Sequence, residues 1–121
     1  MNVFQKLKAS LRLREAVKKA EEAHSLTGER YYVMPLSGSK GKLIIMDRFN
    51  FRKLKQKGYI PHEAHVRDLE TECFYFTAYR NGTCGIVPEV ENFKRQQYYS
   101  WYAGCIRNHK KKKHHEVRSQ K

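Results

Sequence analysis

The stretch that most constrains the fold is residues 43–58, LIIMDRFNFRKLKQKG, where a short apolar run passes directly into a basic segment. The apolar run, Leu43–Met46, includes β-branched residues and predicts a buried strand. Asp47 or Asn50 can accept a hydrogen bond from the unpaired N–H groups of a new helix, so either is a candidate N-cap. Gly58 follows the basic last turn, where a left-handed residue ends a helix. We therefore expect a strand that leads into a short, capped helix.

That helix combines a narrow apolar seam with a high density of positive charge. Phe51 and Leu54 supply the seam, with Phe49 as a further candidate. The basic residues on its other faces are Arg48, Arg52, Lys53, Lys55 and Lys57. Such a surface attracts polyanions, but it indicates no particular reaction.

Charge is unevenly distributed along the chain. The 121 residues include 25 Lys and Arg against 12 Asp and Glu, a formal net charge of +13. Residues 61–92 contain six acidic and two basic residues, whereas residues 93–121 contain nine basic residues and one acidic residue. Basic blocks around an acidic middle favour a polyanionic partner, although charge can also serve solubility alone. Nucleic acid is the polyanion we expect, because phosphate contacts release counterions.

Length and composition indicate one folded domain in the cytoplasm. A chain of this size can bury a core, and a hydrophobic content of 40% excludes wholesale disorder. The N-terminus has no apolar run typical of a signal peptide, and no stretch approaches the ~20 apolar residues of a membrane span. Cys73, Cys84 and Cys105 are odd in number and lack a framework spacing, so we expect reduced thiols.

Residues 2–24 predict a helix with a thin apolar seam. The seam residues follow a spacing of three or four: Val3, Phe4, Leu7, Leu11, Leu13 and Val17. Two interpretations remain open. The helix either docks on a sheet of its own domain or packs on a partner or a second copy of the chain.

The expected strands follow this helix. Residues 30–36, RYYVMPL, predict a strand whose end Pro35 confines to an edge or a bulge, and residues 37–42 predict a basic hairpin tip leading to Leu43. Residues 73–79 predict a third strand that ends in a tight turn at Asn81-Gly82, and residues 83–87 are a candidate return strand. Before the third strand, acidic residues alternate as on a solvated strand face: Asp68, Glu70 and Glu72.

Pro88 and Glu89 predict the start of a final helix, which we expect to fray near Asn108. The whole is an α+β fold, with a small antiparallel sheet of three to four strands packed with an N-terminal, a short central and a C-terminal helix. The predicted order is α-β-β-α-β-(β)-α. We expect residues 1–109 to form the single domain, of which 1–28 are the amphipathic helix and a candidate partner-facing element, and 110–121 to form a disordered basic tail.

Metal and catalytic chemistry find little support. Cys105 and His109 are four residues apart on the expected last helix, and Cys73 and Cys84 would complete a Cys3His zinc set, but the short knuckle spacing is missing. Whether these four residues converge on a metal stays open. No nucleotide loop, nucleophile elbow or paired metal motif is present, so we expect neither an enzyme nor a cofactor.

We predict that the protein binds nucleic acid through phosphate contacts, with little sequence discrimination. The candidate residues are Lys40, Lys42, Arg48, Arg52, Lys53, Lys55, Lys57, Lys110, Lys111, Lys112 and Lys113. Aromatic side chains on an open sheet face would stack on single-stranded bases, unless they are ordinary packing residues: Tyr31, Tyr32, Tyr75 and Tyr79. The alternative is a structural subunit of a homo-oligomer, a larger complex or a virus-like particle, acting through protein contacts.

Overall fold

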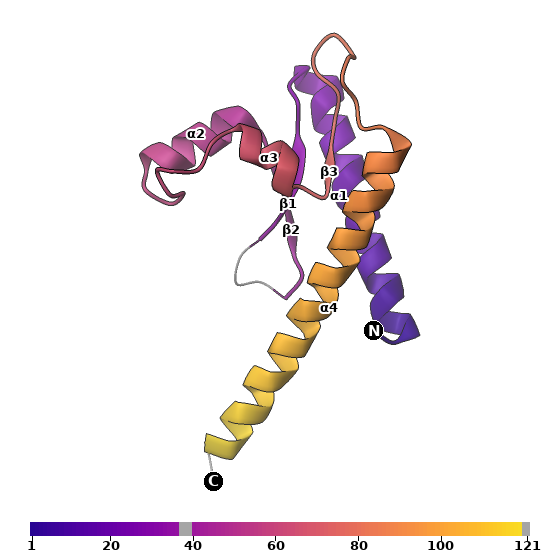
Figure 1. Cartoon of the computed structure of the whole chain (residues 1–121), viewed down its shortest axis with the longest axis vertical. Helices are drawn as coiled ribbons and strands as arrows, with labels where there is room; N and C mark the ends of the chain where they lie inside the picture. The colour runs from indigo at the N-terminus through magenta and orange to yellow at the C-terminus, as the bar shows by residue number, and fades with distance from the viewer. Residues whose placement is uncertain (37–39, 120–121) are drawn as a thin grey trace.

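The computed structural model describes residues 1–36 and 40–119, with side chains as far as Asn108. Within this part of the chain, four helices flank one three-stranded antiparallel sheet (Figure 1). The elements are α1 (Val3–Thr27), β1 (Tyr32–Pro35), β2 (Leu43–Met46), α2 (Arg48–Gln56), α3 (Arg67–Glu72), β3 (Tyr75–Phe76) and α4 (Pro88–Ser119). This arrangement confirms the predicted α+β class.

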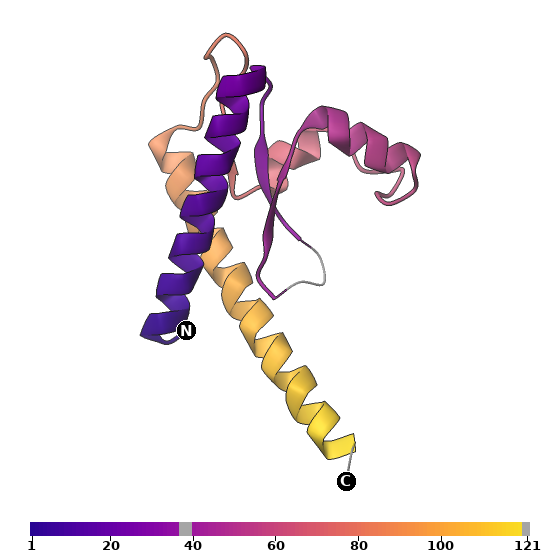
Figure 2. The ribbon, with the colours of Figure 1, turned by 180° about the vertical axis from the view of Figure 1, so that it is seen from behind.

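Helix α1 lies along one face of the sheet (Figure 2). It begins with a capping box, in which Asn2 and Gln5 exchange side-chain and backbone hydrogen bonds, and it ends at Gly28 with φ of 76°. Its buried residues are Ala9, Ala16 and Ala20. Alanines leave no bulk between the helix and its neighbours, so α1 can approach the sheet closely.

The predicted seam of α1 is therefore wrong over its first half. Leu13 and Val17 do pack against the core. The exposed fractions of Val3 and Phe4 are 81% and 82%, and those of Leu7 and Leu11 are 58% and 48%. Two apolar stripes share this helix: the alanines face inward together with Leu13 and Val17, while the large residues of its first turns face solvent.

The sheet has the order β2-β1-β3, with β1 in the centre. Strand β1 pairs with β2 in register from Tyr32 opposite Met46 to Pro35 opposite Leu43, and successive side chains of each strand point to opposite faces of the sheet. Val33 packs against α1, while Tyr32 packs on the other face with Phe51 of α2 and the buried Leu69 of α3. Both faces are thus covered. Pro35 lies beyond the pairing with β3, so only its β2 side needs backbone hydrogen bonds.

Strand β3 is shorter than predicted, at two residues. Beyond Phe76 the Thr77 hydroxyl accepts a hydrogen bond from the backbone N–H of Tyr31 (2.9 Å), which replaces a regular ladder contact. The tight turn at Asn81-Gly82 is confirmed, since Gly82 has φ of 77° and the Tyr79 N–H donates to the Thr83 carbonyl (3.0 Å). The candidate return strand over residues 83–87 is not formed.

The acidic segment before β3 is a helix, not the predicted strand face. Asp68 and Glu70 occupy the first turn of α3, where negative charge suits the helix dipole. At its other end the Lys94 ammonium donates to the carbonyls of Glu70 (2.7 Å) and Cys73 (3.0 Å). A contact from a residue so distant in sequence could not be read from local spacing.

The hairpin between β1 and β2 rests on α4. Residues 37–39 of its predicted basic tip lie outside the described residues. Gly41 has φ of 82°, and a Cβ atom there would lie 2.6 Å from the Tyr102 ring. Only glycine fits this position, and its close approach to Tyr102 places the hairpin against the middle of α4.

Helix α4 carries the aromatic part of the core. Tyr98 is fully buried and its hydroxyl donates to the carbonyl of Ala9 (2.6 Å), while Phe74 packs against Tyr98 and Trp101 with ring centroids 5.3 Å away in each case. The backbone stays helical through Ser119, well past the predicted end near Asn108. Figures 1 and 2 show its last turns extending beyond the other elements.

Candidate nucleic-acid interface

Helix α2 projects from the side of the sheet, and its ends are fixed as predicted. The Asp47 carboxylate accepts from the Asn50 N–H (2.7 Å), and Gly58 is left-handed with φ of 83°. The helix attaches to the core through Phe51, which is 5% exposed, with support from Leu54. Figure 1 shows that α1 and α4 lie away from it. Most of the rest of its surface faces solvent.

That surface is cationic and contains no acidic residue. Arg48 and Arg52 form one row at a spacing of four, and Phe49, Lys53 and Lys57 form the neighbouring row. All five side chains are exposed. Phe49 does not belong to the apolar seam for which it was a candidate, because it is 64% exposed. The Lys53 ammonium lies 5.0 Å from its ring centroid.

Lys55 has a different environment from its neighbours. It is half-buried, and its ammonium donates to the carbonyl of Ala64 (2.6 Å). This bond fastens the loop after α2 to the helix. Among the candidate phosphate contacts on α2, Lys55 is therefore engaged with a backbone carbonyl of the protein itself.

The other candidate basic residues are not brought to α2. Lys40 and Lys42 are exposed, but they precede β2 while α2 follows it, so they lie at the opposite end of that strand. The Arg12 guanidinium donates to the Lys40 carbonyl (2.8 Å) there, and lies over the Tyr102 ring, 5.7 Å from its centroid. The side chains of Lys110, Lys111, Lys112 and Lys113 lie outside the described ones.

The sheet tyrosines do not form an open stacking face. Tyr32 is 5% exposed and its pKa is raised by burial. Tyr75 donates its hydroxyl proton to Glu21 (2.7 Å), and burial with that bond raises its pKa. The Tyr31 hydroxyl lies 3.1 Å from the Thr27 hydroxyl. Only Tyr79 among the four candidates keeps substantial exposure, at 40%.

Tyr79 is held by a buried arginine. The Arg30 guanidinium lies 4.2 Å from the ring centroids of both Phe76 and Tyr79, and it donates to the carbonyls of Thr77 and Cys84 (3.0 Å each). Glu70 adds an ion pair at 3.7 Å. Arg30 thus serves as a structural clamp that fixes the Tyr79 ring at the surface.

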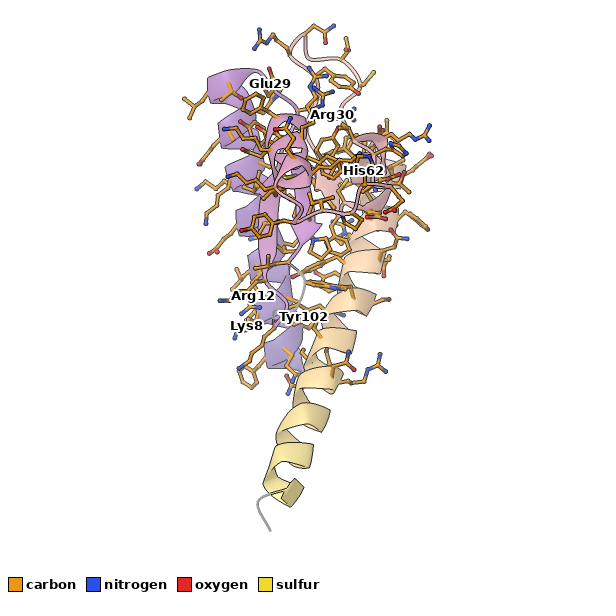
Figure 3. The ribbon with its side chains drawn as sticks, turned by 90° about the vertical axis from the view of Figure 1, so that its left-hand side faces the viewer. Lys8, Arg12, Glu29, Arg30, His62 and Tyr102 are labelled. Carbon is orange, nitrogen blue, oxygen red and sulfur yellow. The ribbon has the colours of Figure 1, made fainter. Side chains whose placement is uncertain are left out.

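Beside this clamp, one carboxylate bridges two exposed arginines. Glu29 lies 3.2 Å from Arg80 and 3.8 Å from Arg48, with the side chains of Arg80 and Arg48 75% and 57% exposed. Two hollows meet at this bridge. One, of about 550 Å³, includes Arg30, Arg48, Tyr79 and Arg80 in its lining, and the other, of about 480 Å³, includes Arg48, Phe49 and Arg52. Figure 3 shows Glu29 and Arg30 at the end of the molecule opposite Arg12 and Tyr102.

Sequence reasoning missed Glu29, Arg80 and Tyr79 as parts of one surface with α2. Arg80 and Tyr79 belong to the acidic middle of the chain, and Gly28 turns the chain so that Glu29 meets Arg80. The signal available in the sequence was the helix-ending Gly28 directly before Glu29-Arg30, which fixes where these two charges emerge.

The cysteines remain separate within the described part of the chain, where no three metal-binding side chains gather around one point. Cys73 is buried and Cys84 is exposed. Burial raises the pKa of the Cys73 thiol. It also raises the pKa of the Cys105 thiol, which is less deeply buried. The side chain of His109 lies outside the described ones, so whether the four residues converge on a metal stays an open question.

The described helices include none that is both long and apolar enough to cross a bilayer. Comparisons with protein families, with curated proteins and with solved structures found no match to this chain.

Proposed function

We propose that this protein binds nucleic acid through phosphate contacts made by α2, with little sequence discrimination. One observation carries the proposal: the outward face of α2 presents Arg48, Arg52, Lys53 and Lys57 without a single acidic residue on the helix. Phosphate contacts position a protein on nucleic acid but carry no sequence information, so modest discrimination is expected. The proposed role is non-enzymatic and cytoplasmic.

The shape of α2 supports this role. It is attached to the body through one strongly buried residue, Phe51, while its basic side chains extend into solvent. Each lysine or arginine that neutralises a phosphate releases condensed counterions, which makes such an interface sensitive to salt. A helix whose charge served solubility alone would not need to concentrate it on one projecting element.

Titration of labelled single-stranded and double-stranded oligonucleotides at a low and a moderate salt concentration tests the proposal. We expect measurable binding at low salt that weakens steeply as salt rises, with similar affinity across unrelated sequences. Absence of binding at low salt would exclude the proposed function.

A second candidate function rests on the exposed stripe of α1. Val3, Phe4, Leu7 and Leu11 present large apolar side chains on one side of the helix, and contiguous exposed apolar surface marks protein contact sites. We propose as the alternative that this stripe joins copies of the chain, or joins the chain to a larger assembly.

Light scattering distinguishes this alternative. If α1 mediates self-assembly, the wild type is larger than a monomer and the double variant Phe4→Ser, Leu7→Ser shifts to the monomer mass. Leu26→Ser is the matched control, because Leu26 is 87% exposed at the other end of α1. A wild type that is monomeric at all concentrations counts against self-assembly.

A further inference from the structure

We propose that the two hollows beside α2 form one groove for single-stranded nucleic acid, and that Glu29 occupies the place of a backbone phosphate within it. The inference rests on the proposed function and specifies its strand class and path. The groove runs from Tyr79 and Arg80 past Glu29 to Phe49 and Arg52. Its two halves share Glu29 and Arg48 in their linings.

The Glu29 bridge has the chemistry of an anion site filled from within. Its two carboxylate oxygens face different guanidinium groups, Oε1 that of Arg80 at 3.2 Å and Oε2 that of Arg48 at 3.8 Å. Carboxylate and phosphate oxygens are interchangeable partners for arginine. Because all three side chains are more than one third exposed, the internal ion pairs are weak and an incoming phosphate can displace the carboxylate.

Aromatic rings lie on both sides of this anion site. Tyr79 lines the first hollow, where the Arg30 guanidinium 4.2 Å from its centroid holds the ring in place. Phe49 lines the second hollow and is 64% exposed. Bases of any identity stack on such rings, so stacking here would add affinity without sequence discrimination, as the phosphate contacts of α2 do.

The groove favours single strands over duplexes for a geometric reason. Each hollow, at about 550 and 480 Å³, falls within the ~300–1,000 Å³ typical of small-ligand sites, so an unstacked base fits. In a duplex the bases are paired and stacked, and only phosphates would reach Arg48 and Arg80. Stacking on Tyr79 and Phe49 is therefore available to a single strand alone.

The backbone keeps room for this arrangement. Gly28 has φ of 76°, and a Cβ atom there would lie 3.0 Å from Nε of Arg80. Glycine thus ends α1, turns the chain toward Glu29 and leaves space for the arginine beside it. The same residue sets both the helix end and the geometry of the anion site.

The central test is Glu29→Gln, assayed with fluorescent oligothymidylate, oligouridylate and a short duplex at low salt. We expect both single strands to bind about two- to fivefold more tightly, because a competing carboxylate is removed, with a smaller gain for the duplex. Glu15→Gln is the control for charge alone, since exposed Glu15 lies on α1 and lines neither hollow.

Removing the arginine or the tyrosine of the groove should lower the affinity for single strands, whereas Glu29→Gln should raise it. Arg80→Ala should weaken single-strand binding about fivefold or more. This loss should exceed that of the control Arg14→Ala, which removes an exposed arginine of α1. Tyr79→Leu should weaken single-strand binding and leave duplex binding unchanged. Circular dichroism melts verify folding, and Glu29→Gln keeps the test valid if a packing variant fails to fold.

The groove is excluded if the wild type binds nucleic acid while Glu29→Gln behaves as Glu15→Gln and Arg80→Ala behaves as Arg14→Ala. It is equally excluded if Glu29→Gln tightens the duplex as much as the single strands. These outcomes leave the role of α2 standing. Failure of the wild type to bind any oligonucleotide instead excludes the proposed function itself.

Discussion

Lys94 is the residue on which the end of α3 depends. Its side chain is buried, and its ammonium donates to three backbone carbonyls, of Glu70 (2.7 Å), Thr71 (3.3 Å) and Cys73 (3.0 Å). The last carbonyls of a helix have no intrahelical partners, and a cation there also suits the dipole. A six-residue helix with one buried side chain gains its stability from this contact and from Leu69.

Lys94→Met should lower the free energy of unfolding by about 2–3 kcal/mol, because a flexible apolar side chain leaves buried carbonyls without donors. Chemical denaturation measures the loss. Lys19→Met on the exposed side of α1 is the control and should change stability by less than about 0.5 kcal/mol. Equal stability of the two variants would show that Lys94 does not hold α3.

The three thiols should react in the order of their exposure. Cys84 is exposed, Cys105 is intermediate and Cys73 is buried. Burial raises the pKa of the Cys73 thiol, so at neutral pH less of it is thiolate and its reaction accelerates only at more alkaline pH. Mass spectrometry after brief maleimide treatment should find Cys84 modified first and Cys73 last, with all three modified alike in denaturant. Early modification of Cys73 in the native protein would contradict its burial.

At the residue scale, local signals were readable in the sequence and distant ones were not. Asp47 and Gly58 predicted where α2 begins and ends, because helix capping depends on neighbours within a few residues. The roles of Arg30 and Lys94 depend on Thr77, Cys84 and the end of α3. No spacing rule connects residues so far apart, so the sequence did not indicate that these cations are buried.

At the element scale, α1 shows why periodicity alone misplaced a face. Its sequence carries a stripe of alanines and a stripe of large apolar residues at the same helical period, and hydrophobicity favours the second. Close packing favoured the first, since Ala20 fits against Val33 of the sheet. Strand β3 was overestimated for a similar reason, because strong β formers over residues 73–79 do not guarantee a pairing partner.

Whether the last turns of α4 contribute to stability can be tested directly. The described packing of this helix on the body includes Lys94, Tyr98, Trp101, Tyr102 and Ile106, all of which precede residue 110. Four successive lysines at positions 110–113 repel one another, although cations at a helix C-terminus suit its dipole.

Deleting residues 110–121 removes six basic residues and one acidic residue. We expect the melting temperature to change little, because the predicted tail adds charge without adding to the core, while oligonucleotide affinity and its salt dependence both fall. Thermal denaturation and fluorescence anisotropy measure the two effects. Unfolding of the truncated protein would show that the domain extends past residue 109.

At the scale of the whole molecule, the structure gathers charge in a way that a count along the chain could not. The basic candidates whose side chains are described divide between α2 and the hairpin end, which are separated by β2. Arg80, from the acidic middle of the sequence, meets Arg48 of α2 through Glu29. The sequence predicted a basic helix after a strand, and tertiary contacts decided which other charges accompany it.

The most direct test of this account compares the salt dependence of single-strand binding in two triple variants. Arg52→Gln, Lys53→Gln, Lys57→Gln removes three charges from α2, and Arg14→Gln, Lys18→Gln, Lys19→Gln removes three exposed charges from α1. We predict that the α2 variant lowers the slope of log Kobs against log salt by about 2, since each phosphate contact contributes about 0.7 for single strands. The α1 variant should retain the wild-type slope. Equal slopes in the two variants, or a loss confined to the α1 variant, would contradict the claim that α2 is the nucleic-acid-binding element.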